Sequence, residues 1–183
     1  MKFIILGCGS SMGVPRADGF FGNCDPKNKK NYRTRCSALI QTSDENILVD
    51  TSPDLRQQLL RHKIKKIDKV LYSHMHADQT HGINDLRSFY INNKRPINVY
   101  ADKFTSKYLK ENFSYIFKGY SKEYPATLKL NKLEKNTYTK NLDKKVKIRS
   151  IVVEHGMVKS NCFIIDNKIA YISDVNKIYK KDE

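Results

Sequence analysis

The sequence predicts a mixed α/β fold, because strand-like and helix-like patterns alternate along its 183 residues. Short apolar runs rich in β-branched side chains, bounded by Gly, Pro, Asn or Asp, are typical of strands and dominate both ends of the chain. Between them, apolar residues recur at intervals of three and four, which is typical of helices. A chain of this length can bury an adequate core in one compact piece, so we expect a single domain over residues 1–183.

The first two thirds of the chain supply one strand, one hairpin and then alternating helices and strands. Residues 2–7 (KFIILG) form an apolar run that ends in a glycine-rich turn, and residues 36–50 alternate as a hairpin does. Ser52-Pro53-Asp54 is typical of a helix start, with a hydroxyl N-cap, a proline at the first position and an acid in the first turn. The elements expected next are a helix to about residue 62, a strand at 70–72, a helix around 83–90, a strand at 97–100 and a helix at 103–117.

The last third is predicted to be mostly strand. The pattern between residues 126 and 142 is weak and polar, which indicates short strands and loops. Residues 146–153 alternate clearly between apolar and polar side chains, and two apolar runs at 162–165 and 169–172 flank an Asp-Asn turn. No internal repeat or linker interrupts these elements.

A group of metal-competent side chains stands directly after the strand at 70–72. His74, His76 and Asp78 occupy alternate positions, and in an extended segment alternate side chains project to the same side. A helix follows, so its N–H groups point towards whatever the three side chains hold. Neutral imidazole and carboxylate are typical ligands of zinc, manganese or iron. The pattern favours a metal site over the alternative, a histidine-rich surface loop.

Two more candidate ligands stand at the ends of late strands. His155 follows the apolar run 151–153 and precedes a glycine, and Asp174 directly follows residues 169–173. A histidine or aspartate at a strand end is often only structural. A metal site nevertheless needs ligands from several elements, and these two residues are placed to complete one.

The charge balance is strongly basic, with 34 Lys and Arg against 19 Asp and Glu, a net charge of +15 and a pI near 9.6. Such a charge favours polyanionic partners, namely nucleic acid, phosphate esters or acidic membrane surfaces. A lysine-rich background explains the charge equally well, because Lys, Asn and Ile recur together in many segments. Charge alone therefore does not decide the partner.

Nothing in the sequence indicates export or membrane insertion. The chain leads from Met1 straight into the strand at residues 2–7 without a secretory signal, and no apolar run approaches the length of a membrane span. We therefore expect a cytoplasmic protein with no membrane partner.

The four cysteines include no C-x-x-C pair, and a reducing compartment argues against disulfides. Cys8 and Cys162 lie in apolar runs, so we expect them to be buried. Cys24 and Cys36 flank a polar basic loop, which leaves a structural metal site as an alternative to ordinary free thiols.

Several of these motifs resemble one known family. The segment HMHADQTHG, residues 74–82, resembles the His-x-His-x-Asp-His motif of the metallo-β-lactamase superfamily. The segments MKFIILGCGSSMGVPR, GNCDPKN…TRCS and NILVDTSPDLR resemble the branch that contains phosphoribosyl cyclic-phosphate phosphodiesterases and stands close to the tRNA 3′-processing endonucleases. The resemblance extends from Met1 to about Asp174. It implies an αββα sandwich.

The resemblance also implies a role for each candidate ligand. By it, His74, His76 and His155 form a first metal site. Asp78 serves a second site, and Asp174 bridges the two ions.

Asp50 is expected to support the site rather than to bind an ion. It ends an apolar run, and in the family the aspartate at this place lies beneath the metals. We expect its carboxylate to accept the outer N–H of a ligating histidine, because such a bond fixes the tautomer of the ring and raises its basicity.

The chain departs from the family pattern at two places. The fourth position of the motif, normally histidine, is Gln79, and an amide binds zinc far more weakly than imidazole does. His81, two residues on, is an alternative ligand, although a helical start would turn it away. The last metal-binding histidine of the family lies well beyond the bridging aspartate, whereas nine residues follow Asp174. We therefore expect a C-terminally truncated sandwich, incomplete in its second half, that holds about one zinc ion rather than two.

The preferred function is that of a metal-dependent phosphodiesterase that acts through a metal-activated water. Asp78 or Asp174 would orient that water and accept its proton. Candidates for binding the substrate phosphate are Arg16, Arg33 and Arg35, since guanidinium matches phosphate geometry.

Two other functions stay open at this point. One is a catalytically impaired remnant that keeps the fold and binds metal or nucleic acid, and the other is a hydrolase of thioesters or lactams. A phosphate ester or RNA is the expected partner. A homo-oligomer, or a second chain that supplies the absent half, is the expected assembly.

Overall fold

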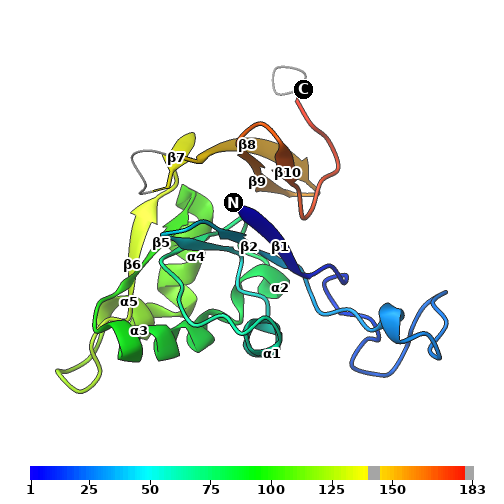
Figure 1. Ribbon diagram of the computed structural model, residues 1–183, viewed down its shortest axis with the longest axis horizontal. Coiled ribbons are helices and arrows are strands. Elements are labelled where there is room, and N and C mark those ends of the chain that lie inside the picture. The colour runs from blue at the N-terminus through cyan, green and yellow to red at the C-terminus, as the bar shows by residue number, and fades with distance from the viewer. Residues whose placement is uncertain (140–144, 180–183) are drawn as a thin grey trace.

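A computed structural model describes residues 1–139 and 145–179 of the chain (Figure 1). Its larger sheet has six strands, and neighbours in the sheet follow the order of the sequence. The first three strands pair antiparallel, and the others join in parallel. The strands are β1 (Lys2–Gly7), β2 (Ser37–Gln41), β3 (Asn46–Val49), β4 (Lys69–Leu71), β5 (Ile97–Ala101) and β6 (Leu128–Lys132).

Short helices cover one face of the larger sheet (Figure 1). They occupy the crossovers between the parallel strands, because strands that pair in parallel must be joined by a crossover, which is usually helical. No helix in the described ranges is long and apolar enough to cross a membrane. The helices of this layer are α1 (Leu55–Arg61), α2 (Ala77–Thr80), η2 (Ile83–Leu86), α3 (Arg87–Asn93), α4 (Lys103–Asn112) and α5 (Ser114–Lys118).

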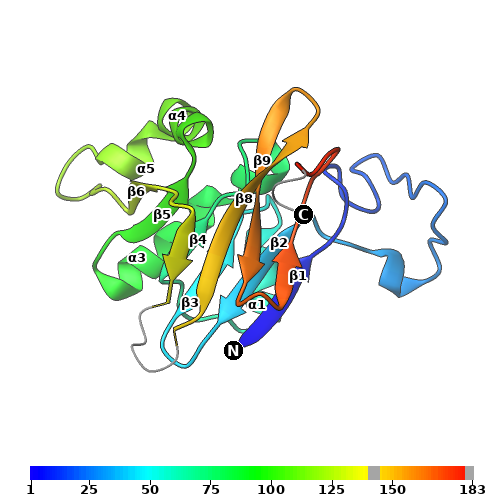
Figure 2. The same cartoon turned by 90° about the horizontal axis from the view of Figure 1, so that it is seen from above.

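A smaller sheet lies against the other face of the larger one, in the strand order β10-β9-β8-β7 (Figures 1 and 2). Its long central hairpin turns at Gly156, whose φ of 57° lies in the left-handed region that glycine adopts without strain. No helix of the described ranges covers its outer face, so three layers of the expected αββα sandwich are present. The strands are β7 (Asn136–Tyr138), β8 (Lys147–His155), β9 (Val158–Ile165) and β10 (Ile169–Tyr171).

Two apolar cores hold these layers together. Leu48 and Val70 pack between the larger sheet and its helices, whereas Val49, Leu71 and Phe163 pack between the two sheets. Successive residues of a strand point to opposite faces, so each central strand contributes to both cores. Complete burial of one such side chain stabilises the fold by about 1.5–3 kcal/mol.

The predicted α/β class is confirmed, and three of the expected helices differ in detail. The helix expected around 83–90 is divided into η2 and α3. The helix predicted from Ser52 begins at Leu55, because the hydroxyl of Ser52 accepts the N–H of Asp54 at 3.1 Å in a turn before it. The helix predicted at 103–117 is interrupted at Phe113, whose φ of −128° and ψ of 36° leave the helical region. That region therefore forms α4 and α5 instead of one helix.

Two of the late strands, β8 and β9, extend further than predicted, whereas β10 ends one residue earlier than predicted. The strand expected at 146–153 continues to His155, and the strand expected from Cys162 begins at Val158, because the two strands pair along their whole length. Of the weak polar stretch, residues 140–142 lie outside the described residues.

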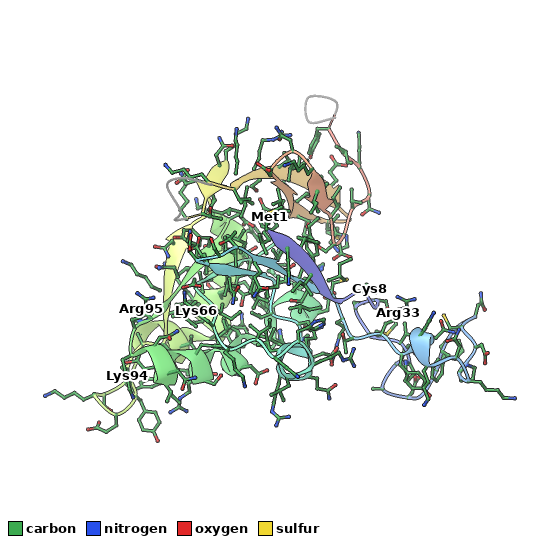
Figure 3. All side chains as sticks on the ribbon, in the orientation of Figure 1. Met1, Cys8, Arg33, Lys66, Lys94 and Arg95 are labelled. Carbon is green, nitrogen blue, oxygen red and sulfur yellow. The ribbon has the colours of Figure 1, made fainter. Side chains whose placement is uncertain are left out.

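Residues 10–35 leave the body of the molecule as an extended arm that contains the short helix η1 (Lys29–Asn31) (Figures 1 and 2). No residue of this arm is buried. Cys8, at the foot of the arm, is exposed and not buried as predicted, because β1 has already ended (Figure 3). Cys162 is buried, as predicted.

Candidate metal centre

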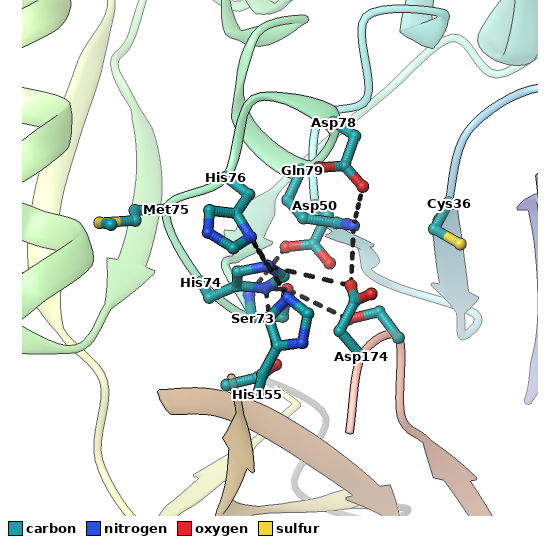
Figure 4. Close-up of polar contacts among 12 residues, drawn as sticks. Cys36, Asp50, Ser73, His74, Met75, His76, Asp78, Gln79, His155 and Asp174 are labelled. Atoms are coloured by element: carbon teal, nitrogen blue, oxygen red, sulfur yellow. Dashed lines mark hydrogen bonds and ion pairs between the residues drawn. The ribbon is translucent and has the colours of Figure 1, made fainter. Parts of the chain in front are cut away.

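Three imidazole rings meet between the end of β4 and the end of β8 (Figure 4). Nδ1 of His76 lies 3.0 Å from Nε2 of His74 and 3.3 Å from Nε2 of His155. One nitrogen of each ring lies within 4.8 Å of the others, and residues 1–139 and 145–179 contain no other such group of potential ligands. Zinc binds nitrogen at about 2 Å in tetrahedral geometry, so the three rings are spaced to share one ion.

The larger sheet supplies two of these rings and the smaller sheet the third. The segment between β4 and α2 bends at Ser73 and Met75, and His76 is extended (φ −60°, ψ 154°) directly before α2 begins. His74 and His76 point to the same place, with 3.0 Å between Nε2 and Nδ1. His155 is the last residue of β8, immediately before the turn at Gly156. The group therefore exists only because the two sheets dock at this end.

His74 is held as a neutral ring. It is 1% exposed, and its Nδ1 lies 3.0 Å from Oγ of Ser73 and 3.5 Å from Oγ of Ser160. Burial, followed by the charges of the neighbouring imidazoles, lowers its pKa from 6.5 to about 4. A neutral ring that is anchored at one nitrogen presents the other to a metal ion.

Gln79 joins the two carboxylates beside the rings (Figure 4). Its Nε2 donates to Oδ2 of Asp78 at 2.8 Å and to Oδ2 of Asp174 at 3.3 Å. The side chain is fully buried, and its Oε1 has no hydrogen-bond partner in the described part of the chain. The amide nitrogen therefore lies between the two carboxylates that the family resemblance assigns to a second metal site.

Asp50 does not make the predicted hydrogen bond to a histidine. Its Oδ1 accepts the backbone N–H of Ser73 at 2.7 Å, and its buried Oδ2 has no hydrogen-bond partner among the described residues. Burial raises the pKa of this carboxyl to about 8. The serine hydroxyls beside His74 take the role that the sequence assigned to Asp50, and Asp50 instead holds the backbone of the corner.

The two serines beside His74 differ in how far they lie from it along the sequence. Ser73 directly precedes His74, so the sequence alone could have indicated a contact between its hydroxyl and the ring. Ser160 lies 86 positions from His74, and only the docking of β9 brings its hydroxyl to the ring.

His81 lies apart from the three rings. Its Nδ1 is 3.1 Å from Oγ1 of Thr80, and its ring packs edge-on against Phe113 with 5.5 Å between centroids. It follows the last turn of α2, which directs the side chain towards α4 and α5. His81 is therefore not placed to substitute for the histidine that Gln79 replaces.

Arg35 is committed to an ion pair close to the centre. Its Nε and Nη2 donate to Oδ2 and Oδ1 of Asp54 at 2.8 and 2.6 Å, in the bidentate arrangement that guanidinium favours. This pairing lowers the pKa of Asp54 and raises that of Arg35, to which the charge of Asp78 also contributes. The guanidinium is therefore near enough to the centre to interact with its carboxylates.

The other two arginines belong to the arm and its base. Arg16 is ion-paired with Asp18 and lies 4.7 Å above the ring of Phe20. Nη1 of Arg33 lies 3.0 Å from Sγ of Cys8 (Figure 3 labels both residues).

Cys24 and Cys36 take no part in the histidine group. Cys24 is exposed on the arm, whereas Cys36 is half-buried beside the centre, with its Sγ 3.4 Å from the carbonyl oxygen of Gly9 (Figure 4). Burial, and then the charge of Asp174, raises the pKa of the Cys36 thiol to about 11, so it stays protonated near pH 7.

The donor set fits a divalent ion. Three nitrogen atoms within ligand spacing and two adjacent carboxylates match the preferences of zinc and related metals. Buried polar atoms without partners are rare in proteins and call for an ion or a water molecule. Two such atoms, Oδ2 of Asp50 and Oε1 of Gln79, belong to this region of the described chain.

Comparison with known proteins agrees with this geometry. The family described as the beta-lactamase superfamily domain matches residues 45–183. An octanoyltransferase of Porphyromonas gingivalis is 32% identical over 181 residues, which cover 97% of this chain and 35% of that protein. A ribonuclease Z of Staphylococcus epidermidis is 31% identical over 98 residues, which cover 50% of this chain and 32% of that protein. The chain thus spans about a third of the length of these curated relatives.

Two solved structures share the fold. A diphosphatase from the PhnP family superposes with a TM-score of 0.72 and 29% identity, over 89% of this chain and 61% of that chain. Zn²⁺-bound PqqB from Methylobacterium extorquens superposes with a TM-score of 0.72 and 17% identity, over 99% of this chain and 68% of that chain. The fold and the branch that the sequence motifs resemble are confirmed.

Proposed function

This chain belongs to the beta-lactamase superfamily, and we propose that it is a metal-dependent hydrolase that cleaves phosphodiester bonds. The observation that carries the proposal is the convergence of His74, His76 and His155, whose ligand nitrogens lie within 4.8 Å of one another. A divalent ion bound there supplies a Lewis acid and lowers the pKa of water towards neutrality. Zinc is the proposed ion, because it favours three nitrogen ligands with an open fourth position.

The two carboxylates are the proposed catalytic groups. Gln79 engages Oδ2 of Asp78 and Oδ2 of Asp174, which leaves Oδ1 of each carboxylate to hold a water molecule. A carboxylate in hydrogen-bond reach of the attacking water orients it and accepts its proton. Asp174 is the nearer of the two to the rings, since its Oδ2 lies 3.9 Å from Nε2 of His74.

We propose that the chain holds one ion and not two. The nitrogen of the Gln79 amide faces both carboxylates, and an N–H group cannot coordinate a cation. In the metal-free chain the opposite orientation would point the amide oxygen at two negative charges, so the orientation that donates to both carboxylates is favoured. Charge that develops on the leaving oxygen is then left to basic side chains, for which Arg33 and Arg35 are the candidates.

Two observations support a phosphate ester as the substrate class. The net charge of +15 favours a polyanion. The similar proteins include one named as a diphosphatase and one named as ribonuclease Z, both of which are names for phosphate chemistry. The name octanoyltransferase indicates acyl chemistry instead, and this chain covers a similar share of that protein (35%) and of the ribonuclease Z (32%).

A second candidate function is metal or nucleic-acid binding without turnover. It is favoured by Gln79, because a second ion normally stabilises the attacking or leaving oxygen in two-metal hydrolases. This candidate and the hydrolase share the same metal site and differ only in turnover.

The test is to measure bound zinc and the hydrolysis of bis(p-nitrophenyl) phosphate for wild type, His76→Ala and His81→Ala. Loss of the His76 ring removes one of three ligands, so we expect zinc content to drop and turnover to fall about 100-fold, or about 2.7 kcal/mol in barrier height. His81→Ala is the matched control, because this exposed histidine lies outside the group and its loss should change neither quantity.

Two outcomes separate the candidates. Turnover that survives His76→Ala would refute the metal mechanism. Firm zinc binding by wild type without any turnover of the phosphodiester would select the binding protein over the hydrolase.

A further inference from the structure

Asn161 is a buried asparagine that joins separate parts of the fold around the histidine group. It lies in β9 and is 6% exposed. Its backbone N–H and its side-chain Nδ2 both donate to the carbonyl oxygen of Ser73, at 2.8 and 2.9 Å. Nδ2 also donates to Oδ2 of Asp102 at 2.8 Å, and Oδ1 accepts the hydroxyl of Ser150 at 3.2 Å. Both ends of the amide are therefore satisfied.

The partners of Asn161 are themselves parts of the centre or its support. Ser73 directly precedes His74, and its hydroxyl lies 3.0 Å from Nδ1 of that ring. Asp102 is the N-cap of α4, where its carboxylate accepts two backbone N–H groups of the first turn. One side chain of the smaller sheet thus fixes the end of β4 and the start of α4.

The hydrogen bonds from Asn161 to Ser73 join the smaller sheet to the larger one, and the three histidine rings also come from both sheets. β10 pairs with β9 only along Phe163–Ile165 and does not reach Asn161. The backbone N–H of Asn161 is therefore free to donate to the carbonyl oxygen of Ser73. His74 and His76 follow β4 of the larger sheet, whereas His155 ends β8 of the smaller one. The spacing of the three rings therefore depends on how firmly the two sheets are held at this point.

We propose that Asn161 is a positioning residue for the metal centre, which sets the distance between His155 and the two histidines of the larger sheet. The inference rests on the proposed metal site but not on hydrolysis. A buried amide that bridges a carbonyl and a carboxylate is costly to lose, because its partners are left unsatisfied in a medium of low dielectric. Outer partners that orient metal ligands typically contribute 10–100-fold to metal affinity.

The experiment compares the zinc affinity of wild type, Asn161→Ala and Asn161→Asp, by competition with a chromophoric chelator. The matched control is Asn131→Ala in β6, whose Nδ2 also donates to several acceptors, namely Oδ1 of Asn98 at 3.2 Å and the carbonyl oxygens of Val99 at 3.4 Å and Lys129 at 2.9 Å. We expect the zinc dissociation constant to rise about 10–100-fold in Asn161→Ala and to change less than about twofold in Asn131→Ala.

Cobalt absorption provides a second readout, because its visible bands report the geometry of the ligands. Asn161→Asp keeps the shape of the side chain but turns a carboxylate oxygen towards Ser73 and Asp102, so its cobalt spectrum should also shift. This variant carries the test if Asn161→Ala does not fold. Thermal unfolding of the metal-free proteins shows whether the Asn161 and Asn131 variants lose comparable stability.

Zinc affinity and a cobalt spectrum equal to those of wild type, in a folded Asn161 variant, would overturn the proposal. Comparable losses of stability with unequal losses of zinc affinity would support it, since a merely structural role does not single out the metal. Hydrolysis is not measured here, so zinc binding without turnover in wild type counts against the proposed function alone.

Discussion

The amide nitrogen of Gln79 lies 3.3 Å from Oδ2 of Asp174, although 95 positions separate the two residues in the sequence. The same nitrogen lies 2.8 Å from Oδ2 of Asp78. A neutral amide thus bridges the two carboxylates that the family resemblance assigns to a second metal site. It donates a hydrogen bond to each of them and offers no ligand atom on that side, which supports the proposal of one ion rather than two.

Replacing Gln79 with histidine should raise the zinc content from about one to about two ions per chain, because an imidazole adds a ligand where the amide offers donors. The measurement is elemental analysis after dialysis against a weak chelator. Gln79→Leu is the control, since it removes the same amide without adding a ligand and should leave one ion. Two firmly held ions in the unmodified protein would show that another group completes the second site.

The stability of the metal-free protein should decrease as pH rises from 6.5 towards 8. Burial raises the pKa of Asp50 from 3.8 to about 8, so the folded state retains a proton that the unfolded state has lost. The stability from this group is complete below pH 3.8 and is lost as pH rises through 8. The expected slope is about 1.4 kcal/mol per pH unit.

His74 does not disturb this measurement. Its pKa is 6.5 when unfolded and about 4 when folded, so above pH 6.5 the ring is mainly neutral in both states. Urea denaturation in the presence of a chelator gives the free energy of unfolding at each pH. Asp50→Asn keeps the acceptor for Ser73 and removes the titration, so its curve should lack this slope. Equal slopes in the two proteins would rule out the protonated carboxyl.

Arg35→Lys should lower the free energy of unfolding by about 2 kcal/mol, because lysine cannot make the bidentate pair with the half-buried Asp54. Arg16→Lys is the matched control, since the pair of Arg16 and Asp18 is exposed on the arm and such pairs contribute little. Urea denaturation of the metal-free proteins measures both changes. Losses of equal size would mean that burial does not distinguish the two pairs.

Phe163→Ala should destabilise the fold by about 3–5 kcal/mol, because this fully buried ring fills the space between the two sheets. Phe104→Ala removes a ring that is 71% exposed and should cost less than about 0.5 kcal/mol. Thermal or urea unfolding compares them directly. Since His155 depends on the docking of the smaller sheet, zinc affinity should also weaken in Phe163→Ala alone.

The sequence by itself determined the elements and the local part of the metal centre. The apolar runs at residues 2–7, 46–49 and 70–72 predicted strands that are present, because a strand pattern depends only on neighbours in the chain. His74 and His76 were placed together for the same reason, since two positions along an extended segment share one side. The unusual amide at Gln79 was also visible at this level.

Only the tertiary structure decided the partners of those residues. The hydroxyls of Ser73 and Ser160, and not the carboxylate of Asp50, lie beside His74. His81 points away from the other histidines, towards Thr80. The amide of Gln79 lies between the carboxylates of Asp78 and Asp174. These contacts span up to 95 positions and depend on how β8 and β9 dock against the end of β4. The docking of the two sheets depends on the combined packing of many apolar side chains between them. These side chains come from distant parts of the chain, so the spacing of residues within one segment does not predict how they pack.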